Sequence, residues 1–298
     1  MSNNLKKTTL GRTGLEVTQL GYGAMEIGGQ RTEVTDKQSE DVLNAVLDSG
    51  ITFIDTSPDY GLSEERIGKY ISQRRDEYFL STKCGCNITY PEGTGQEPSH
   101  LWKGEVFLRN IENSLKRMKV DHVDILQMHN PSGEEVEKNG LVDVLEEIRS
   151  SGKTRFIGVS STAPNLLGFA RMGVFDSFQI PYSLLERVHE DMIREAAGFG
   201  AGIIIRGGIA KGHREPGERW AKWEKAGLND LLGNMSRYEF VLRFTLSHPD
   251  CNTTIVGTAD QDHLRANVAA AQAGPLPGDV YAEAARRLSA IGESPGNA

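Results

Sequence analysis

The feature that most constrains the fold of this chain is an eightfold alternation of apolar, strand-like runs with helix-like segments. The apolar runs occupy residues 17–25, 51–55, 78–83, 123–129, 155–160, 177–181, 202–206 and 253–257. The helix-like segments that follow them occupy residues 36–50, 63–73, 103–118, 141–152, 163–173, 189–200, 237–249 and 260–274. Strands that alternate with helices predict parallel βαβ units. Eight such units are the number in a closed (β/α)8 barrel.

The helix-like segments show an apolar stripe and C-terminal glycines. In residues 103–118 the apolar side chains recur with the 3-4-3 spacing of a helix packed on a sheet, at Leu108, Ile111, Leu115 and Met118. Glycine stands at or near the end of several segments, where it favours a left-handed C-cap: Gly50, Gly152, Gly173 and Gly198. Both patterns support the helix predictions.

The length of the chain agrees with one barrel. A (β/α)8 barrel takes about 250 residues, and this chain has 298 residues with no low-complexity tract or charge run to divide it. We therefore expect a single α/β domain over residues 1–298. An open dinucleotide-binding sheet would need a GxGxxG turn, and the early glycines do not have that spacing: Gly21, Gly23, Gly28 and Gly29.

Three segments lie outside the repeat. Residues 5–14 predict an N-terminal β-hairpin that caps the bottom of the barrel. Residues 278–291 predict an extra C-terminal helix. The polar stretch 211–234 has little periodicity, so we expect a long loop there, and loops of that length are usually functional.

Composition excludes several classes of protein. A net charge of -8 argues against a nucleic-acid binder. No apolar run approaches the roughly 20 residues that span a bilayer, and the N-terminal segment lacks the apolar core of a signal peptide. Three cysteines favour a reducing cytoplasm. No histidine adjoins Cys84 and Cys86 in the sequence, so we expect small buried hydrophobes there and no metal site.

Polar or flexible residues follow the predicted strands at their carboxyl ends, where barrel enzymes build their sites. They are Asp55, Lys83, His129, Ser160, Ser161, Gln179, Arg206, Gly207, Gly208, Gly257 and Thr258. Each residue alone has an ordinary structural explanation, such as a turn or a solvated side chain. Their joint position at strand ends favours a functional rim.

Asp55, Lys83 and His129, together with Tyr60 in a predicted loop, suggest proton transfer. Free tyrosine has a pKa of about 10, and a neighbouring ammonium group lowers that value. Tyr60, Lys83 and Asp55 could form such a set, with the carboxylate keeping the lysine charged. His129 could donate a hydrogen bond to a substrate oxygen. This chemistry would serve a carbonyl that receives a hydride, and the hydride must come from a cofactor.

At this point the motifs resemble those of the aldo-keto reductases over nearly the whole chain. The matching stretches are LGRTGLEVTQLGYGAMEIGG, FIDTSPDYGLSEERIG, STKCG, LRNIENSLKRMKVDHVDILQMHNP and GKTRFIGVSS. The resemblance implies a TIM barrel that binds NADPH, with NADH as the other option, in an extended form. It implies Tyr60 as the general acid, Lys83 and Asp55 as its tuning pair, and His129 as the residue that orients the carbonyl.

The resemblance also implies which residues contact the cofactor. The nicotinamide amide would meet Ser160 and Gln179, and Tyr182 would stack on the ring. The implied contacts are Gly23, Ala24, Met25, Asp55, Ser160, Ser161, Gln179, Tyr182, Arg206, Gly207, Gly208, Ile209, Lys211, Gly212, Gly257, Thr258, His263 and Asn267.

The chain departs from the usual family pattern at a few positions. Ser160-Ser161 replaces the usual Ser-Asn, and Asn130 stands where tryptophan or arginine is common. Gly257-Thr258 replaces Lys-Ser, and His263 replaces an arginine, although Arg265 lies nearby. A 2′-phosphate needs a fixed cation nearby. The expectation of NADPH therefore depends on Arg265, on Thr258 and on the use of NADPH by many members of the family.

The resemblance implies a cytoplasmic oxidoreductase that reduces small aldehydes or ketones to alcohols, or performs the reverse reaction. Two alternatives stay open, an NAD-dependent sugar or alcohol dehydrogenase and a cofactor-binding regulatory subunit with little turnover. A Schiff-base lyase is disfavoured because Lys83 has Tyr60 and Asp55 as partners. The residues name neither the substrate, nor the oligomeric state, nor the role of Trp102, Trp220 and Trp223 in stacking or packing.

Overall fold

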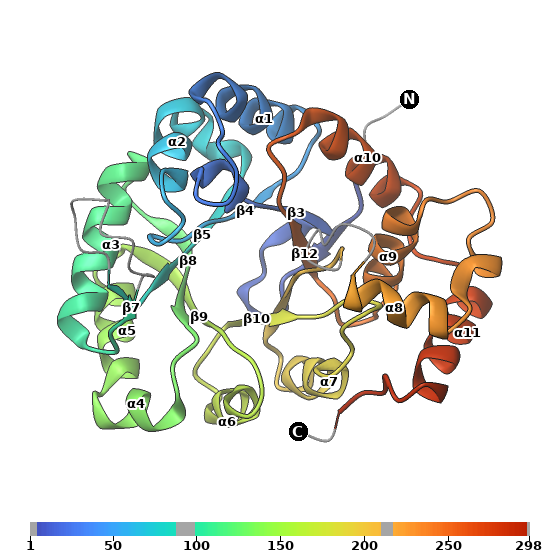
Figure 1. Ribbon diagram of the computed structural model, residues 1–298. Coiled ribbons are helices and arrows are strands. Elements are labelled where there is room, and N and C mark those ends of the chain that lie inside the picture. The colour runs from blue at the N-terminus through green and yellow to red at the C-terminus, as the bar shows by residue number, and fades with distance from the viewer. Residues whose placement is uncertain (1–4, 88–98, 210–216, 297–298) are drawn as a thin grey trace.

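The structure is a computed structural model that describes residues 5–87, 99–209 and 217–296. Its centre is a closed barrel of parallel strands, in the order β10-β11-β12-β3-β4-β5-β8-β9 (Figure 1). The strands are β3 Leu20–Gly23, β4 Phe53–Asp55, β5 Phe79–Cys84, β8 Val123–His129, β9 Thr154–Ser160, β10 Ser177–Pro181, β11 Gly202–Arg206 and β12 Thr253–Val256. The predicted α/β barrel is confirmed, and each barrel strand overlaps its predicted run.

Helices surround the barrel (Figure 1). They are α1 Asp36–Asp48, α2 Ser63–Tyr70, α3 Gly104–Met118, α4 Gly133–Lys138, α5 Leu141–Ser150, α6 Asn165–Met172, α7 Glu190–Gly198, α8 Glu218–Lys225, α9 Arg237–Leu246, α10 Gln261–Gln272 and α11 Gly278–Ala290. The extra C-terminal helix is confirmed as α11, which packs Tyr281 on Phe244 of α9 with ring centroids 4.6 Å apart. Among the residues that the structure describes, no helix has the length and apolar character that crossing a membrane requires.

Helix α3 illustrates how the sequence pattern positions a helix on the barrel. Phe107, Ile111 and Met118 are fully buried, whereas Leu108 and Leu115 are partly buried at the flank of the stripe. The predicted apolar face therefore does pack on the barrel. The most buried line of side chains runs through Phe107, Ile111 and Met118, and Leu108 and Leu115 lie at its edge. The helix ends at Lys119, which adopts a left-handed conformation with φ 54.

The predicted glycine C-caps are mostly confirmed. Gly50, Gly152 and Gly173 have positive φ angles of 84, 80 and 72, which residues with a Cβ rarely adopt. The prediction for Gly198 is wrong, because Gly198 is the last residue of α7 and the left-handed position falls on Gly200, with φ 81.

An N-terminal hairpin closes the bottom of the barrel. Strands β1 Lys7–Thr9 and β2 Glu16–Thr18 pair antiparallel on either side of a 3-10 turn, so the hairpin extends beyond the predicted 5–14. Its buried Leu10, Leu15 and Val17 form one apolar cluster with the barrel side chains Phe53, Ile125 and Ile204. Burial of this cluster seals the end of the barrel opposite the carboxyl ends of the strands.

The prediction of a long loop over 211–234 is wrong for its second half. Helix α8 and a 3-10 turn at Leu228–Leu231 occupy this region, while residues 211–216 lie outside the described ranges. Trp220 and Trp223 are buried against each other, and Trp223 also packs on Phe240 with centroids 5.4 Å apart. These two tryptophans are packing residues, so tertiary contacts order a segment that has little periodicity of its own.

Candidate functional site

The barrel brings the polar strand ends to a single rim. Asp55, Lys83 and His129 lie at or next to the carboxyl ends of β4, β5 and β8, and all barrel strand pairs are parallel. His129 is the register partner of Ser160 on β9. The clustering expected from the strand ends is therefore present in space.

Lys83 and Asp55 form a buried ion pair at this rim. Lys83 Nζ lies 2.7 Å from Asp55 Oδ2, and the two side chains are 0% and 1% exposed. Lys83 Nζ also donates to the Thr56 carbonyl oxygen over 2.9 Å. It lies 4.9 Å from the centroid of the Tyr60 ring. A buried charge needs partners of this kind, and the contacts hold the ammonium group beside the tyrosine.

Gln127 is a member of this site that the sequence analysis did not identify. Its amide Nε2 donates to Asp55 Oδ1 over 3.1 Å and to Ser81 Oγ over 2.7 Å. Gln127 is also the register partner of Lys83. The available signal was its position two residues before His129, which places both on the same face of β8.

The loop after β4 presents Tyr60 through short-range hydrogen bonds. The Tyr60 amide donates to the Ser57 carbonyl oxygen over 3.1 Å, and the Leu62 amide donates to the Gly28 carbonyl oxygen over 3.1 Å. Gly28 lies against this loop so closely that a Cβ there would be 2.0 Å from the Tyr60 carbonyl oxygen. The position of Tyr60 therefore depends on close backbone contact with the 3-10 turn Glu26–Gly28.

The electrostatics of Tyr60 differ in part from the expectation. Burial raises the pKa of Tyr60, and the opposing effect of Lys83 does not overcome it, so the net pKa lies above the usual value. Burial also opposes the charge on Lys83, but Asp55 and Tyr60 outweigh that effect and raise the pKa of Lys83. The expected lowering by Lys83 is thus present as one contribution. The resulting state is a protonated phenol beside a charged ammonium group.

His129 is also a neighbour of the tyrosine. The two rings are arranged edge to face with centroids 6.4 Å apart. Burial lowers the pKa of His129 to about 3, against the opposing effect of Asp59. The imidazole is therefore neutral near pH 7, and a neutral ring carries one N–H donor. Such a ring can donate a hydrogen bond to an oxygen placed beside the Tyr60 hydroxyl.

Ser160 and Gln179 lie together on β9 and β10, as expected for an amide-binding pair. The Ser160 hydroxyl donates to Gln179 Oε1 over 3.2 Å, and the Ser161 amide donates to the Gln179 carbonyl oxygen over 3.1 Å. The buried Gln179 Nε2 has no hydrogen-bond partner within the part of the chain that the structure describes. An unpaired buried donor of this kind fits the carboxamide oxygen of a nicotinamide ring.

Tyr182 is buried against other aromatic rings just after β10. It has no exposed surface, and its ring packs on His248 and Phe244 with centroids 5.1 and 6.4 Å away. Its stacking on a cofactor ring stays a prediction. The alternation of side chains along a strand predicts the face of the sheet on which each side chain lies, but only within the strand. Tyr182 lies one residue beyond the end of β10.

The residues after β11 form a tight turn. Arg206 ends the strand, and burial lowers the pKa of its guanidinium group. Gly207 has φ 75, and a Cβ on Gly208 would lie 2.2 Å from Thr254 Oγ1, so both positions need glycine. Ile209 is half-buried. The expected contacts at Lys211 and Gly212 lie outside the described residues.

The strand ends of β3 and β12 meet between β11 and β4. A Cβ on Gly257 would lie 2.7 Å from the Gly23 carbonyl oxygen, and the Ala24 amide donates to the Asp55 carbonyl oxygen over 2.8 Å. Met25 is half-buried beside them. The structure thus joins the expected contact residues Gly23, Ala24 and Gly257 to the site that contains Asp55.

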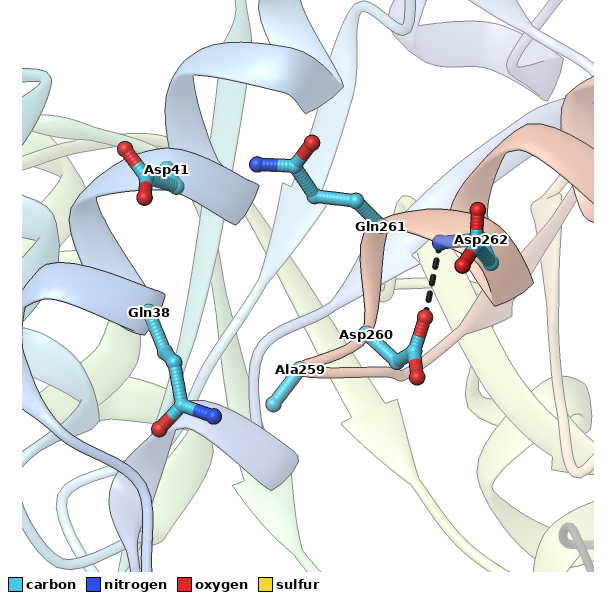
Figure 2. Close-up of a pocket in the computed structure, with 6 residues that line it drawn as sticks. All are labelled: Gln38, Asp41, Ala259, Asp260, Gln261 and Asp262. Atoms are coloured by element: carbon cyan, nitrogen blue, oxygen red, sulfur yellow. Dashed lines mark hydrogen bonds between the residues drawn. The ribbon is translucent and has the colours of Figure 1, made fainter.

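A cavity of about 280 Å³ lies where β12 leads into α10 (Figure 2). It is lined by Gln38, Asp41, Ala259, Asp260, Gln261 and Asp262. Asp260 Oδ1 accepts hydrogen bonds from the amides of Asp262 and His263, over 2.7 and 3.2 Å. The first amides of α10 are therefore already paired within the chain, and the lining carries three carboxylates.

The remaining expected contacts line the start of α10. Thr258 is buried and accepts a hydrogen bond from the Asp260 amide over 3.0 Å. His263 is exposed, and Asn267 is half-buried one helical turn later. Arg265, also exposed, pairs with Asp262. This end of the rim therefore holds both a cation and a group of carboxylates.

Comparison with known proteins identifies the family of this chain. The model of the aldo/keto reductase family matches residues 19–220. A holo-form aldo-keto reductase of Bacillus halodurans superposes with a TM-score of 0.85 at 26% identity, covering 95% of this chain and 96% of that one. An uncharacterised oxidoreductase of Bacillus subtilis is 26% identical over 90% of this chain and 92% of its own length. L-Galactose dehydrogenase of Arabidopsis thaliana is 26% identical, covering 88% and 86%. The family match spans most of the barrel, and its range includes Asp55, Tyr60, Lys83 and His129. The chain is therefore a member of the aldo/keto reductase family.

Proposed function

We propose that this protein is an NADP(H)-dependent reductase that converts small aldehydes or ketones to alcohols, or runs the reverse reaction. The observation that carries the proposal is the buried Lys83–Asp55 pair, with Lys83 Nζ 4.9 Å from the Tyr60 ring centroid. Membership of an oxidoreductase family supports the same reaction class.

In this proposal each side chain of the rim has a separate role in the reduction of the carbonyl group. Tyr60 gives its hydroxyl proton to the carbonyl oxygen, and Lys83 stabilises the phenolate that remains. Asp55 keeps Lys83 charged and in place. The neutral His129 donates a hydrogen bond to the same oxygen and orients it. A bound nicotinamide would supply the hydride.

The residues proposed to hold the cofactor are spread around the rim. Gln179 and Ser160 would bind the carboxamide, because Gln179 Nε2 is a buried donor without a partner among the described residues. The turn at Gly207 and Gly208 would lie along the phosphates. Thr258, His263, Arg265 and Asn267 would contact the adenosine end.

The charges at the adenosine end bear on the choice between NADPH and NADH. Arg265 is held to Asp262 by an exposed pair, and such pairs contribute under about 1 kcal/mol, so a 2′-phosphate can recruit the guanidinium group. Asp41, Asp260 and Asp262 favour the second candidate, an NAD-dependent sugar or alcohol dehydrogenase, because carboxylates disfavour a phosphate. The sugar dehydrogenase among the relatives also supports that candidate.

A fluorescence titration tests the proposed cofactor. We expect purified protein to bind NADPH saturably and more tightly than NADH, and then to oxidise NADPH when aldehydes or ketones are added. Tighter binding of NADH would move the assignment to the second candidate. Binding of neither cofactor would refute the proposed reaction.

Gly28→Ala should lower turnover without removing cofactor binding. The added Cβ would meet the Tyr60 carbonyl oxygen at 2.0 Å and force the loop to shift. A displacement of about 1 Å at a reacting group lowers rate by about 10²-fold. Steady-state kinetics with an aldehyde would measure the change in kcat.

The matched control for this variant is Gly168→Ala in α6, where a Cβ would meet nothing within 4 Å. This control should keep its kcat and gain up to about 1 kcal/mol of stability, because alanine favours a helix interior. Full activity in Gly28→Ala would mean that the loop does not depend on this contact.

A further inference from the structure

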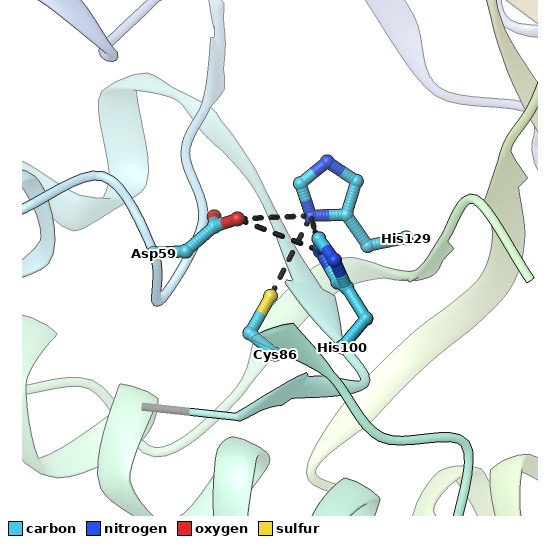
Figure 3. A group of neighbouring side chains, drawn as sticks. All are labelled: Asp59, Cys86, His100 and His129. Atoms are coloured by element: carbon cyan, nitrogen blue, oxygen red, sulfur yellow. Dashed lines mark hydrogen bonds and ion pairs between the residues drawn. The ribbon is translucent and has the colours of Figure 1, made fainter. Parts of the chain in front are cut away.

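A group of four potential metal ligands lies at the edge of the rim, beside the proposed proton-transfer residues. Asp59, Cys86, His100 and His129 each offer one ligand atom, and these atoms all lie within 4.8 Å of one another (Figure 3). Cys86 and His100 come from a small antiparallel pair, β6 Cys86–Asn87 and β7 Ser99–His100. Asp59 belongs to the loop that also carries Tyr60.

Four of the six separations between these atoms match those around a tetrahedral zinc ion, and the other two are no longer than 4.8 Å. His129 Nδ1 lies 3.2 Å from His100 Nε2, 3.5 Å from Cys86 Sγ and 3.5 Å from Asp59 Oδ2. His100 Nε2 lies 3.5 Å from Asp59 Oδ2. Zinc bonds of about 2.0–2.3 Å at tetrahedral angles place neighbouring ligands about 3.3–3.6 Å apart.

Hydrogen bonds alone do not account for this convergence. His129 Nδ1 has three polar neighbours, but a ring nitrogen offers either one proton or one lone pair. It can therefore satisfy only one neighbour with good geometry. A cation at the centre of the group satisfies all four atoms at once.

The neighbouring residues hold the ligands in place. Cys86 and His100 are register partners of the β6–β7 pair. Asn110 Oδ1 accepts from the Cys86 amide over 3.0 Å, and Asn110 Nδ2 donates to the Cys86 carbonyl oxygen over 2.9 Å. Trp102 stacks on the His100 ring with centroids 5.3 Å apart. Supporting contacts of this kind orient the ligands of metal sites.

The carboxylate ligand also has a supporting contact. Ser57 donates to Asp59 Oδ1. Metal binding displaces the proton of the Cys86 thiol, so a thiolate and a carboxylate together would carry the two negative charges that a divalent ion requires in a buried place.

We infer that Asp59, Cys86, His100 and His129 form a binding site for a divalent metal ion of the zinc class. One sulfur, two nitrogens and one oxygen are a zinc ligand set, whereas magnesium and calcium take oxygen ligands. The site was not expected from the sequence, because neither histidine adjoins Cys86 along the chain. Cys84, by contrast, is a buried hydrophobe as expected and lies outside the group.

A metal ion here would also fix the state of His129, a consequence that rests on the proposed function. Coordination through Nδ1 leaves the single ring proton on Nε2. Figure 3 shows this second nitrogen pointing away from the other three ligands. The ion would therefore keep His129 in the form that donates a hydrogen bond to a substrate oxygen.

Direct metal analysis tests the site without any need for turnover. The full chain is stripped with a chelator, loaded with Zn²⁺ or Co²⁺, desalted, and measured for metal per chain and for cobalt absorption. We expect about one ion per chain, with the thiolate charge-transfer band and strong visible bands of tetrahedral cobalt, and no competition by Mg²⁺. Absence of stoichiometric metal in the loaded wild-type protein would overturn the proposal.

Two variants and two controls assign the ligands. Cys86→Ala and His100→Ala should weaken binding by more than about 100-fold, since loss of mere supporting partners already weakens it 10–100-fold. His100 is 28% exposed, so its variant should fold even where loss of the buried Cys86 does not. Cys251→Ala and His122→Ala, which lie outside the group, should bind like wild type. Wild-type affinity in both ligand variants would overturn the site.

The test also separates this site from the proposed reaction. If neither cofactor binds, the metal content is unaffected and only the reductase proposal fails. If the reductase proposal holds, stripping the metal should lower kcat while the dissociation constant for NADPH stays unchanged. Equal kcat in the stripped and loaded enzymes would overturn the role of the ion in fixing His129.

Discussion

The Tyr60→Phe variant should reduce carbonyl compounds about 10²- to 10⁴-fold more slowly than the wild-type chain while binding NADPH with the same affinity. Phenylalanine keeps the ring that packs beside Lys83 Nζ and removes only the hydroxyl that the proposed reaction uses. The loop is held by backbone contacts of Tyr60, which the substitution preserves. Steady-state kcat and a fluorescence titration on the same preparation would measure the two effects.

Tyr238→Phe is the matched control, because Tyr238 is an exposed tyrosine on α9 and is not among the residues proposed for proton transfer or cofactor binding. Its kcat should stay within about twofold of wild type, as expected for a surface substitution. Undiminished reduction by Tyr60→Phe would mean that the proton comes from another group. Loss of NADPH binding in that variant would mean instead that Tyr60 has a binding role.

The barrel and the main rim residues could be predicted because both follow from topology. Each strand of a parallel barrel is buried on both faces, so it leaves a short apolar run in the sequence. The polar residue after each run then lies at the same end of the barrel as the others. This reasoning correctly brings Asp55, Lys83 and His129 together, without any information on side-chain contacts.

Local pattern could not predict the parts of the rim that depend on tertiary contacts. Strands β6 and β7 are two residues long, too short to leave a periodic signal, and the sequence between them gives no hint of their pairing. Cys86 and His100 therefore meet without a sequence motif. Helix α8 is similar, because buried contacts of Trp220 and Trp223 stabilise it.

The electrostatic prediction for Tyr60 was incomplete for a related reason. The sequence identifies a cation that lowers the pKa of the phenol, but it does not give the burial that raises it. Burial wins in the structure, so the phenol stays protonated. That state is the one a general acid needs at the start of a reduction.

The second large effect should come from separating the two charges of the buried ion pair. Lys83→Met leaves the Asp55 carboxylate buried with only hydrogen-bond partners such as Gln127, and Asp55→Asn leaves the Lys83 ammonium without its counter-ion. Breaking a buried pair from one side destabilises a protein by about 3–5 kcal/mol. Each single variant should therefore unfold at lower denaturant concentration and also lose about 10²- to 10⁴-fold in kcat.

The double variant Asp55→Leu/Lys83→Met distinguishes a structural role of the pair from a role in proton transfer. Replacing both charges by apolar groups is often neutral or stabilising by about 1–4 kcal/mol, because no uncompensated charge remains. Denaturant unfolding should thus show recovered stability relative to either single variant. Turnover should stay as low as in Lys83→Met, since the ammonium group beside Tyr60 is still missing. Recovery of turnover together with stability would mean that the pair only supports the fold, and the proton-transfer proposal for Tyr60 would then lose its main physical basis.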